Sequence, residues 1–198
     1  MKGLVLIALA ALAAQAQTGM RDPWFRRYPF DIWVKEGATA QLKWQVRVPG
    51  AFLSPHQRLV QRIEARVETT EVERRRDHGE IIFLLEVSDA TGRKWRTHEV
   101  ADLRQIPADA KAKGIAYAQD LFILPGTYTV VLIVCDAKTK EHSLFRREVR
   151  VAPLKTDPLP DAWHDLPPIE FARVYGQPDA WFQPYVRGKL ALQTSAKR

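Results

Sequence analysis

The sequence is poor in residues that crosslink chains or ligate metals. Its 198 residues include one cysteine, Cys135, and no asparagine. One cysteine cannot form an internal disulfide, so the core must be stable without covalent crosslinks. The five histidines show no pair at the spacing of metal ligands, so we expect no metal and no cofactor. Glycine-rich phosphate-binding motifs and the nucleophile elbow are also missing, which favours a protein that is not an enzyme.

The charge is basic but mixed. Lysine and arginine total 30 against 23 acidic residues, which gives a net charge of +7. The densest basic run, residues 74–76, lies between two expected strands and is predicted to be a solvent-exposed hairpin tip. Nucleic acid needs a surface of one sign, so we expect no nucleic-acid partner. The basic run is instead nearly neutralised by its acidic neighbours Glu71, Glu73, Asp77 and Glu80.

The first sixteen residues have the layout of a cleaved secretory signal. Lys2 precedes an apolar stretch over residues 3–14, and Ala14-Gln15-Ala16 fits the small-x-small pattern of signal peptidase sites. Cleavage is predicted after Ala16, and the product is expected to be secreted or periplasmic. The alternative is an N-terminal anchor helix. No second long apolar run follows, so no membrane span is expected after cleavage.

Most of the remaining chain alternates apolar and polar residues with a period of two. This period is typical of half-buried strands, and no long helical period competes with it. Residues 28–34 are expected to add an edge strand, because an edge tolerates Pro29. A single helical turn is predicted over residues 107–113. The main strands are predicted over residues 40–48, 61–67, 81–87, 94–100, 115–124, 128–135 and 145–151. The pattern favours an all-β antiparallel sandwich or barrel.

A short motif carries a resemblance to a known fold. In Leu124-Pro-Gly-Thr-Tyr128-Thr-Val130, a glycine stands two residues before a tyrosine and an apolar residue stands two after it. This resembles the tyrosine corner of immunoglobulin-like and fibronectin-III-like β-sandwiches, whose tyrosine hydroxyl bonds to upstream backbone. The layout also resembles sandwiches found beside von Willebrand A-related modules in secreted acidobacterial proteins. The resemblance implies an immunoglobulin-like domain over residues 17–152, without the paired cysteines of antibody domains.

The strand that follows Tyr128 is apolar on both faces. If Tyr128 points into the core, Val130, Leu132 and Val134 do too, and Val131, Ile133 and Cys135 lie on the opposite face. An apolar outer face needs a cover. Cys135 is expected to be a small buried hydrophobic residue rather than a reactive thiol.

A C-terminal extension over residues 153–198 is rich in proline and aromatic residues. It repeats one motif, Pro-Asp-Ala-Trp, at residues 160–163 and 178–181. The favoured interpretation packs this tail on the sandwich, with its tryptophans covering the Val131 and Ile133 face. The alternative leaves an exposed aromatic surface for a sugar or a partner. Its candidate binding residues are Trp163, Trp181, Tyr175 and Tyr185.

These observations predict an exported, non-catalytic β-sandwich module. Its expected role is protein binding or envelope scaffolding, with an envelope or extracellular protein as partner. The alternative is a carbohydrate-binding module that uses the tail tryptophans on a polysaccharide.

Overall fold

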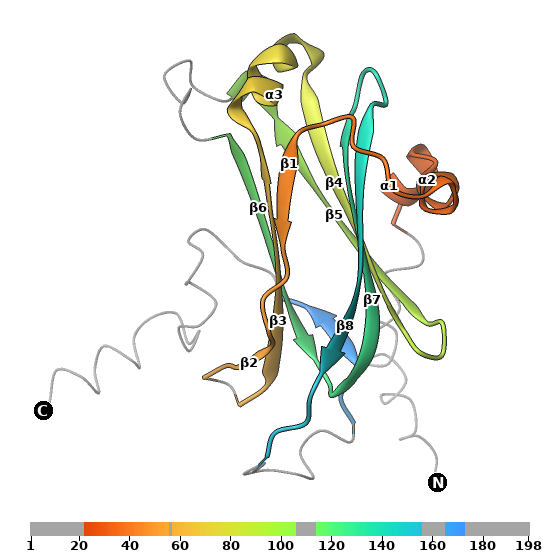
Figure 1. The fold of residues 1–198 in the computed structure, drawn as a ribbon, viewed down its shortest axis with the longest axis vertical. Helices are drawn as coiled ribbons and strands as arrows, with labels where there is room; N and C mark the ends of the chain where they lie inside the picture. The colour runs from red at the N-terminus through yellow and green to blue at the C-terminus, as the bar shows by residue number, and fades with distance from the viewer. Residues whose placement is uncertain (1–21, 56, 106–113, 156–164, 173–198) are drawn as a thin grey trace, which may run out of the picture.

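Two antiparallel β-sheets pack face to face in the computed structural model (Figure 1). The structure describes residues 22–55, 57–105, 114–155 and 165–172. The first sheet has the order β1-β3-β6-β9, with the short strand β2 paired to β3. Its strands are β1 (Trp44–Arg47), β2 (Phe52–Leu53), β3 (Leu59–Val67), β6 (Ile115–Ile123) and β9 (Ile169–Phe171).

The second sheet has the order β5-β4-β7-β8. Its strands are β4 (Glu80–Asp89), β5 (Lys94–Asp102), β7 (Gly126–Asp136) and β8 (His142–Val151). The helical elements are α1 (Trp24–Arg27), α2 (Phe30–Glu36), α3 (Thr69–Arg74), and the 3₁₀ turns η3 (Arg76–His78) and η4 (Leu103–Gln105). The prediction of an all-β, antiparallel fold is confirmed.

The main core lies between the sheets and follows the predicted alternation. On β7, Val130, Leu132 and Val134 pack inward beside Tyr128, whereas Val131, Ile133 and Cys135 belong to a separate cluster on the outer face. The strands predicted from residue 61 to residue 151 all occur, with ends shifted by a few residues. The first is shorter than predicted: β1 covers only Trp44–Arg47, and Ala40 instead forms an isolated bridge with Ser143.

The chain beyond residue 152 contributes one strand to the first sheet. Residues 169–171, which were expected in the C-terminal extension, pair with β6 as β9. Backbone bonds extend this pairing at both ends: the Leu124 amide donates to Pro168, and the Ala172 amide donates to Asp120. At least this part of the tail therefore packs on the sandwich, at the sheet edge beside β6.

The segment predicted as an N-terminal edge strand is helical, so that prediction was wrong. Residues 22–36 form α1 and α2, and we call this segment the N-terminal strap. Phe30 and Trp33, three residues apart, are buried, whereas Ile32 between them is 56% exposed. This spacing follows a helical period and not the period of two that suggested a strand. Pro29 precedes α2, and Gly37 ends it at a φ of 94°, which favours glycine.

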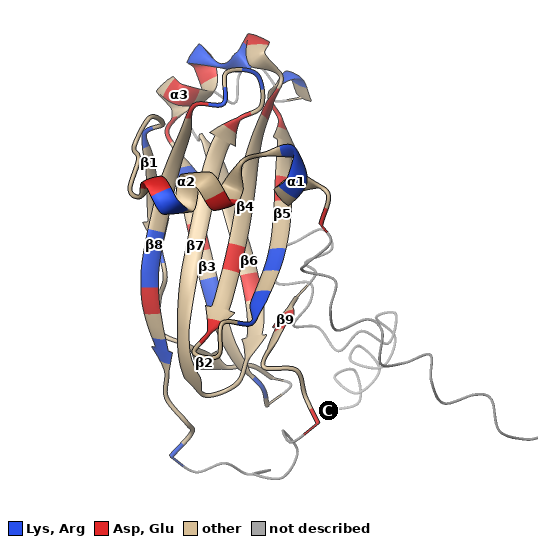
Figure 2. Cartoon of the chain, turned by 90° about the vertical axis from the view of Figure 1, so that its right-hand side faces the viewer, with Lys and Arg blue, Asp and Glu red and all other residues tan. Residues whose placement is uncertain are grey.

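The strap covers the apolar outer face of the second sheet. Four aromatic side chains of the strap pack on the upper half of β4 and β7, and Figure 2 shows the strap crossing there. The expected cover, the tail tryptophans Trp163 and Trp181, lies outside the described residues, and the observed cover comes from the other end of the chain. The cluster joins Phe25, Tyr28, Phe30 and Trp33 to Ile82, Leu84, Val131, Ile133 and Cys135.

The lower half of that outer face is polar and needs no cover. Below the strap, Glu86 on β4 is buried, with Arg96 Nε at 2.6 Å and Lys94 Nζ at 3.1 Å. Arg96 also lies over the rings of Phe25 and Phe30, and its Nη2 is 2.6 Å from Asp31 Oδ1. One arginine therefore joins the polar half of the face to the strap through charge and cation–π contacts.

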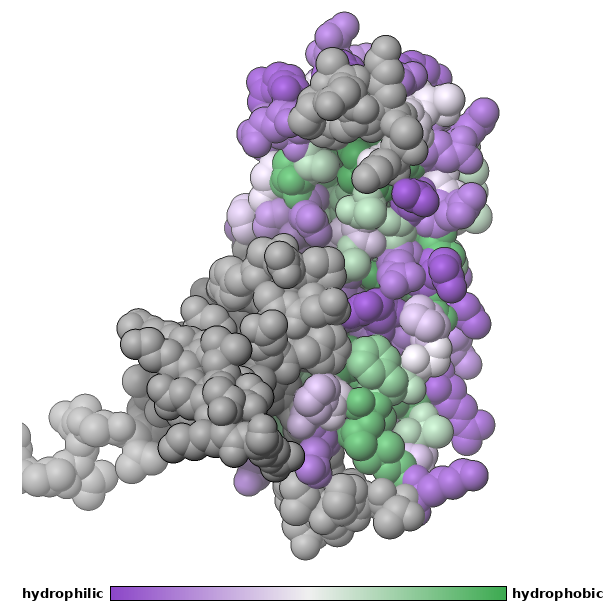
Figure 3. Space-filling view, turned by 90° about the vertical axis from the view of Figure 1, so that its left-hand side faces the viewer, coloured by the Kyte–Doolittle hydropathy of each residue, from purple (hydrophilic) through white to green (hydrophobic). Residues whose placement is uncertain are grey.

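The opposite side of the molecule is seen in Figure 3, where the described hydrophilic residues are interrupted by smaller apolar areas. Over the whole described part of the chain, the exposed large apolar residues are Ile32 on the strap and Phe52 and Leu53 on β2. None of the described helices is long and apolar enough to cross a membrane.

Candidate functional site

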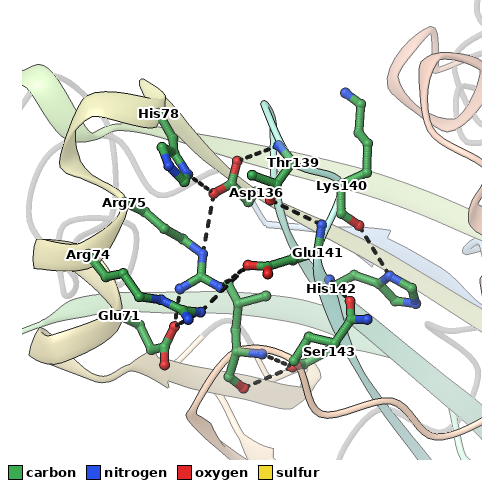
Figure 4. A network of polar contacts seen from close by, with 12 residues as sticks. Glu71, Arg74, Arg75, His78, Asp136, Thr139, Lys140, Glu141, His142 and Ser143 are labelled. Carbon is green, nitrogen blue, oxygen red and sulfur yellow. Dashed lines mark hydrogen bonds and ion pairs between the residues drawn. The ribbon is translucent and has the colours of Figure 1, made fainter.

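A largely buried polar cluster lies where α3 and η3 meet the turn between β7 and β8 (Figure 4). At its centre the Arg75 side chain has no exposed surface. Arg75 donates through Nη1 to Glu71 and through Nη2 to Glu141 Oε2 at 2.5 Å, and its Nε lies 3.3 Å from Asp136 Oδ2. Three carboxylates from two separate segments thus surround one guanidinium. We call this cluster the arginine latch.

The latch corrects the prediction for the basic run. Residues 74–76 were expected to form a solvent-exposed hairpin tip, and for Arg75 this was wrong. The connection between β3 and β4 is helical, so Glu71 in α3 and Arg75, the C-cap four residues later, lie on the same buried side. Arg74 follows the expectation better, since its side chain is 56% exposed and it contacts the same Glu71 at 3.1 Å.

Asp136 at the end of β7 links the latch to the β7–β8 turn. Its Oδ1 accepts from the amides of Lys138 and Thr139, and its Oδ2 lies 2.5 Å from His78 Nδ1. Burial alone would raise the pKa of Asp136, but the hydrogen bonds from His78 and the two amides outweigh burial and lower the pKa. The Asp136 carboxylate is therefore held in its ionised form, which its ion pair with Arg75 requires.

The contacts of the latch join α3 and η3 to the turn between β7 and β8. His78 and Asp136 form an imidazole–carboxylate pair, which in an enzyme orients a general base. A hydrolytic triad also needs a nucleophile on the imidazole, and no hydrogen bond in the described part of the chain joins His78 to a serine, threonine or cysteine side chain. No three potential metal ligands converge anywhere in the residues described.

Two other histidines contact the strap. His98 Nδ1 lies 2.6 Å from Asp22 Oδ2, and its ring packs at 5.1 Å from the Trp24 ring. His142 stacks on Trp33 with ring centroids 4.2 Å apart. Both hold the strap against the second sheet. His56 and His164 lie outside the described residues.

The single cysteine behaves as predicted. Cys135 is buried under the strap, and burial raises the pKa of its thiol to about 12. A thiol with so high a pKa is almost entirely protonated near neutrality, and the strap shields it from reagents.

The binding residues predicted in the tail cannot be placed. Trp163, Trp181, Tyr175 and Tyr185 all lie outside the described residues.

An exposed basic edge was missed by the sequence reasoning. Arg146, Arg147 and Arg150 stand on β8, are exposed, and form no ion pair among the described residues. The motif Arg-Arg-Glu-Val-Arg at residues 146–150 was the available signal, but this stretch was considered only as the last strand of a hairpin. Because β8 is the last strand in its sheet, these arginines line an edge that another chain can reach.

Comparisons with known proteins give little further information. No family model matches the chain, and no curated protein matches it. Among solved structures, a protein from Bordetella pertussis assigned as ApaA is 14% identical, with a TM-score of 0.30 over 58% of this chain and 97% of its own. A structural-genomics target solved by X-ray crystallography is 11% identical, with a TM-score of 0.26 over 69% of this chain and 93% of its own. TM-scores this low do not identify a shared fold.

Proposed function

We propose that this chain is an exported, immunoglobulin-like β-sandwich that binds a protein partner and has no catalytic activity. The observation that carries the proposal is the strand order. In constant-type immunoglobulin sandwiches the first, second, fifth and fourth strands form one sheet, and the third, sixth and seventh form the other. Here β1, β3 and β6 are adjacent in one sheet and β4, β7 and β8 in the other, whereas β5, in the place of the fourth strand, pairs with β4 instead of with β6.

The tyrosine corner supports the same assignment. Its tyrosine belongs near the start of the sixth strand of the sandwich, and its hydroxyl bonds to backbone a few residues upstream. Tyr128 is the third residue of β7, and its hydroxyl donates to the Leu124 carbonyl at 2.9 Å. Gly126 lies against that ring, since a Cβ there would stand 3.3 Å from the tyrosine hydroxyl.

A binding role fits the use that the fold makes of its polar groups. In the described part of the chain, the buried charges of Arg75, Glu86 and Asp136 are committed to ion pairs that join structural elements. Two of the described histidines, His98 and His142, pack against the strap, and Cys135 is covered. The groups left exposed and uncommitted are surface charges, which suit recognition of another macromolecule.

Site-specific photo-crosslinking in cells that export the full chain would test this function. A benzoylphenylalanine placed in turn at Arg150, Ile32 and Glu73 samples three exposed regions of the surface. We expect one or more positions to yield an adduct with one protein of defined mass, while the others yield none.

Two results would contradict the proposal. One is the absence of a protein adduct at every position. The other is turnover of an envelope substrate that disappears when an adjacent pair of acid–base side chains in the tail is changed, as in His164→Ala or Asp165→Asn. A crosslinked or co-purifying polysaccharide would favour the carbohydrate-binding alternative over a protein partner.

A further inference from the structure

One edge of the second sheet is covered only in part. Residues 39–42 run along the upper part of β8: the Leu144 amide donates to the Thr39 carbonyl at 2.8 Å, and the Gln41 amide donates to the His142 carbonyl at 3.2 Å. The chain then turns away to start β1 in the other sheet. The strap's continuation therefore acts as a short extra strand beside β8 and stops above Arg146.

The lower part of the same edge continues this pattern without a partner. In an antiparallel strand, the N–H and C=O of one residue point to the same side, and the side alternates from residue to residue. His142 and Leu144 point outward, so Arg146, Glu148 and Arg150 also point their backbone groups outward. No backbone hydrogen bond joins these three residues to another segment of the described chain on that side. An uncovered edge of this kind is a template for strand addition.

The side chains of this edge carry uncompensated positive charge. Figure 2 shows the alternating charges along β8. Arg146, Arg147 and Arg150 contact no carboxylate in the part of the chain that the structure describes, and Glu148 is the only acidic residue of β8. Elsewhere in the sandwich arginines are paired with carboxylates, as in Arg58, Arg62, Arg74, Arg75, Arg93, Arg96 and Arg104.

We propose that the β8 edge at residues 146–150 is a strand-addition site for an acidic, extended segment of a partner protein. The backbone groups of Arg146, Glu148 and Arg150 form the ladder. Arg146 and Arg150, which share the outer face of β8, bind carboxylates that project from the same face of the added strand. The proposal rests on the proposed protein-binding function and specifies the surface and the chemistry of the partner.

Charge disfavours two of the occupants that this chain itself could supply. A second copy would bring another edge with three arginines and one glutamate, so positive charge would face positive charge. The C-terminal segment 173–198 has five basic residues against a single acidic one, Asp179, so it is repelled as well. A third candidate, residues 156–164, carries Asp157 and Asp161 without a lysine or arginine, but its prolines Pro158 and Pro160 have no amide to donate to a ladder. An acidic segment from another protein is the occupant that the charge of the edge favours.

Peptide binding to the full chain tests the site. The probe is a fluorescein-labelled decapeptide of alternating glutamate and valine. One control peptide replaces glutamate with lysine, and another carries N-methyl groups on alternate amides, which block ladder hydrogen bonds. We expect the acidic probe to bind at least about tenfold more tightly than either control, measured by fluorescence anisotropy at physiological salt.

Two protein variants with equal charge changes separate the edge from general electrostatics. Arg146→Glu/Arg150→Glu is expected to reverse the preference, so that the lysine peptide binds more tightly. Arg93→Glu/Arg104→Glu changes two exposed arginines away from β8 by the same charge and is expected to keep the affinity within about twofold. Hydrogen exchange should show new protection at the amides of Arg146, Glu148 and Arg150.

Each contrary result overturns the site. The acidic probe could fail to bind at about 1 mM, or the N-methylated peptide could bind as tightly as the acidic probe. The Arg146→Glu/Arg150→Glu variant could bind the acidic probe as tightly as the wild type. Hydrogen exchange could show protection only at amides outside Arg146, Glu148 and Arg150. Concentration-dependent dimerisation that is lost in the β8 variant would assign the edge to a second copy instead. Photo-adducts elsewhere on the surface would leave the protein-binding function intact after such a failure, whereas the absence of any adduct would remove the function itself.

Discussion

Tyr128 and Tyr117, both buried in the sandwich, differ in a single hydrogen bond. Tyr128 donates its hydroxyl to the Leu124 carbonyl, whereas the Tyr117 hydroxyl, stacked with its ring on Phe83, has no partner in the described structure. We expect Tyr128→Phe to lower the free energy of unfolding by about 1 kcal/mol, and Tyr117→Phe to leave it unchanged or raise it. Urea denaturation of the two variants measures both values. An unchanged free energy of unfolding in Tyr128→Phe would show that the corner bond contributes nothing.

Arg75 and Arg74 are neighbours in sequence with opposite environments. Replacing Arg75 with methionine leaves Asp136 and Glu71 buried without their cation, and we expect a loss of about 3–5 kcal/mol. Arg74→Met removes an exposed ion pair with the same Glu71, and we expect a loss of at most about 1 kcal/mol. Thermal and urea unfolding of the pair give the comparison. Similar losses in both would mean that the arginine latch is solvated.

At the scale of elements, the strap is a lid whose opening Cys135 can report. Phe30→Ala creates a cavity beneath α2, so the strap should open more often and expose the thiol. We expect the rate of Cys135 labelling by a maleimide to rise by at least about tenfold. Ile32→Ala, on the solvent side of the same helix, should label at the wild-type rate. Equal rates in all three proteins would mean that the strap does not control access.

The strands were predictable because their alternating pattern is local. Leu132 and Val131 lie on opposite faces of β7 because side chains alternate along a strand. The apolar outer face is covered, as the sequence predicted. The cover was misassigned because Tyr28, Phe30 and Ile32 imitate a strand, although Gly37 and the acidic Asp31 in the first turn are helix signals.

The arginine latch could not be predicted from the sequence. His78 and Asp136 are 58 residues apart, and Arg75 and Glu141 are 66 apart. No local spacing records such contacts, since they arise only when β4 and β7 pair and bring both ends together. The basic edge of β8 is a similar case, because only the sheet order shows that β8 is an edge strand.

At the scale of the whole molecule, the latch links stability to pH. The pKa of Asp136 is lower in the folded protein than in the unfolded chain, where the pKa of an aspartate is ~3.9. As the pH falls below that value, the unfolded chain takes up the proton first. The stabilisation is therefore complete above about pH 5 and disappears as the pH falls through the folded-state pKa.

Asp136→Asn should remove this part of the acid sensitivity. We expect the variant to be less stable at pH 7, because Arg75 loses a carboxylate, and its stability to fall less than the wild type's between about pH 5 and pH 2. Urea midpoints measured across that range provide the test. Parallel curves for the two proteins would assign the acid sensitivity to other carboxylates.

The strap also sets an order of events during synthesis. The N-terminal side is made first, yet its binding surface includes Val131, Ile133 and Cys135 on β7, and the Leu42 amide donates to Ser143, 101 residues later. The aromatic residues of the strap must therefore stay uncovered until most of the sandwich has emerged. Contacts of such long sequence separation slow folding. In the nascent chain, Phe25 and Trp33 are consequently accessible to chaperones before they can pack against β4 and β7.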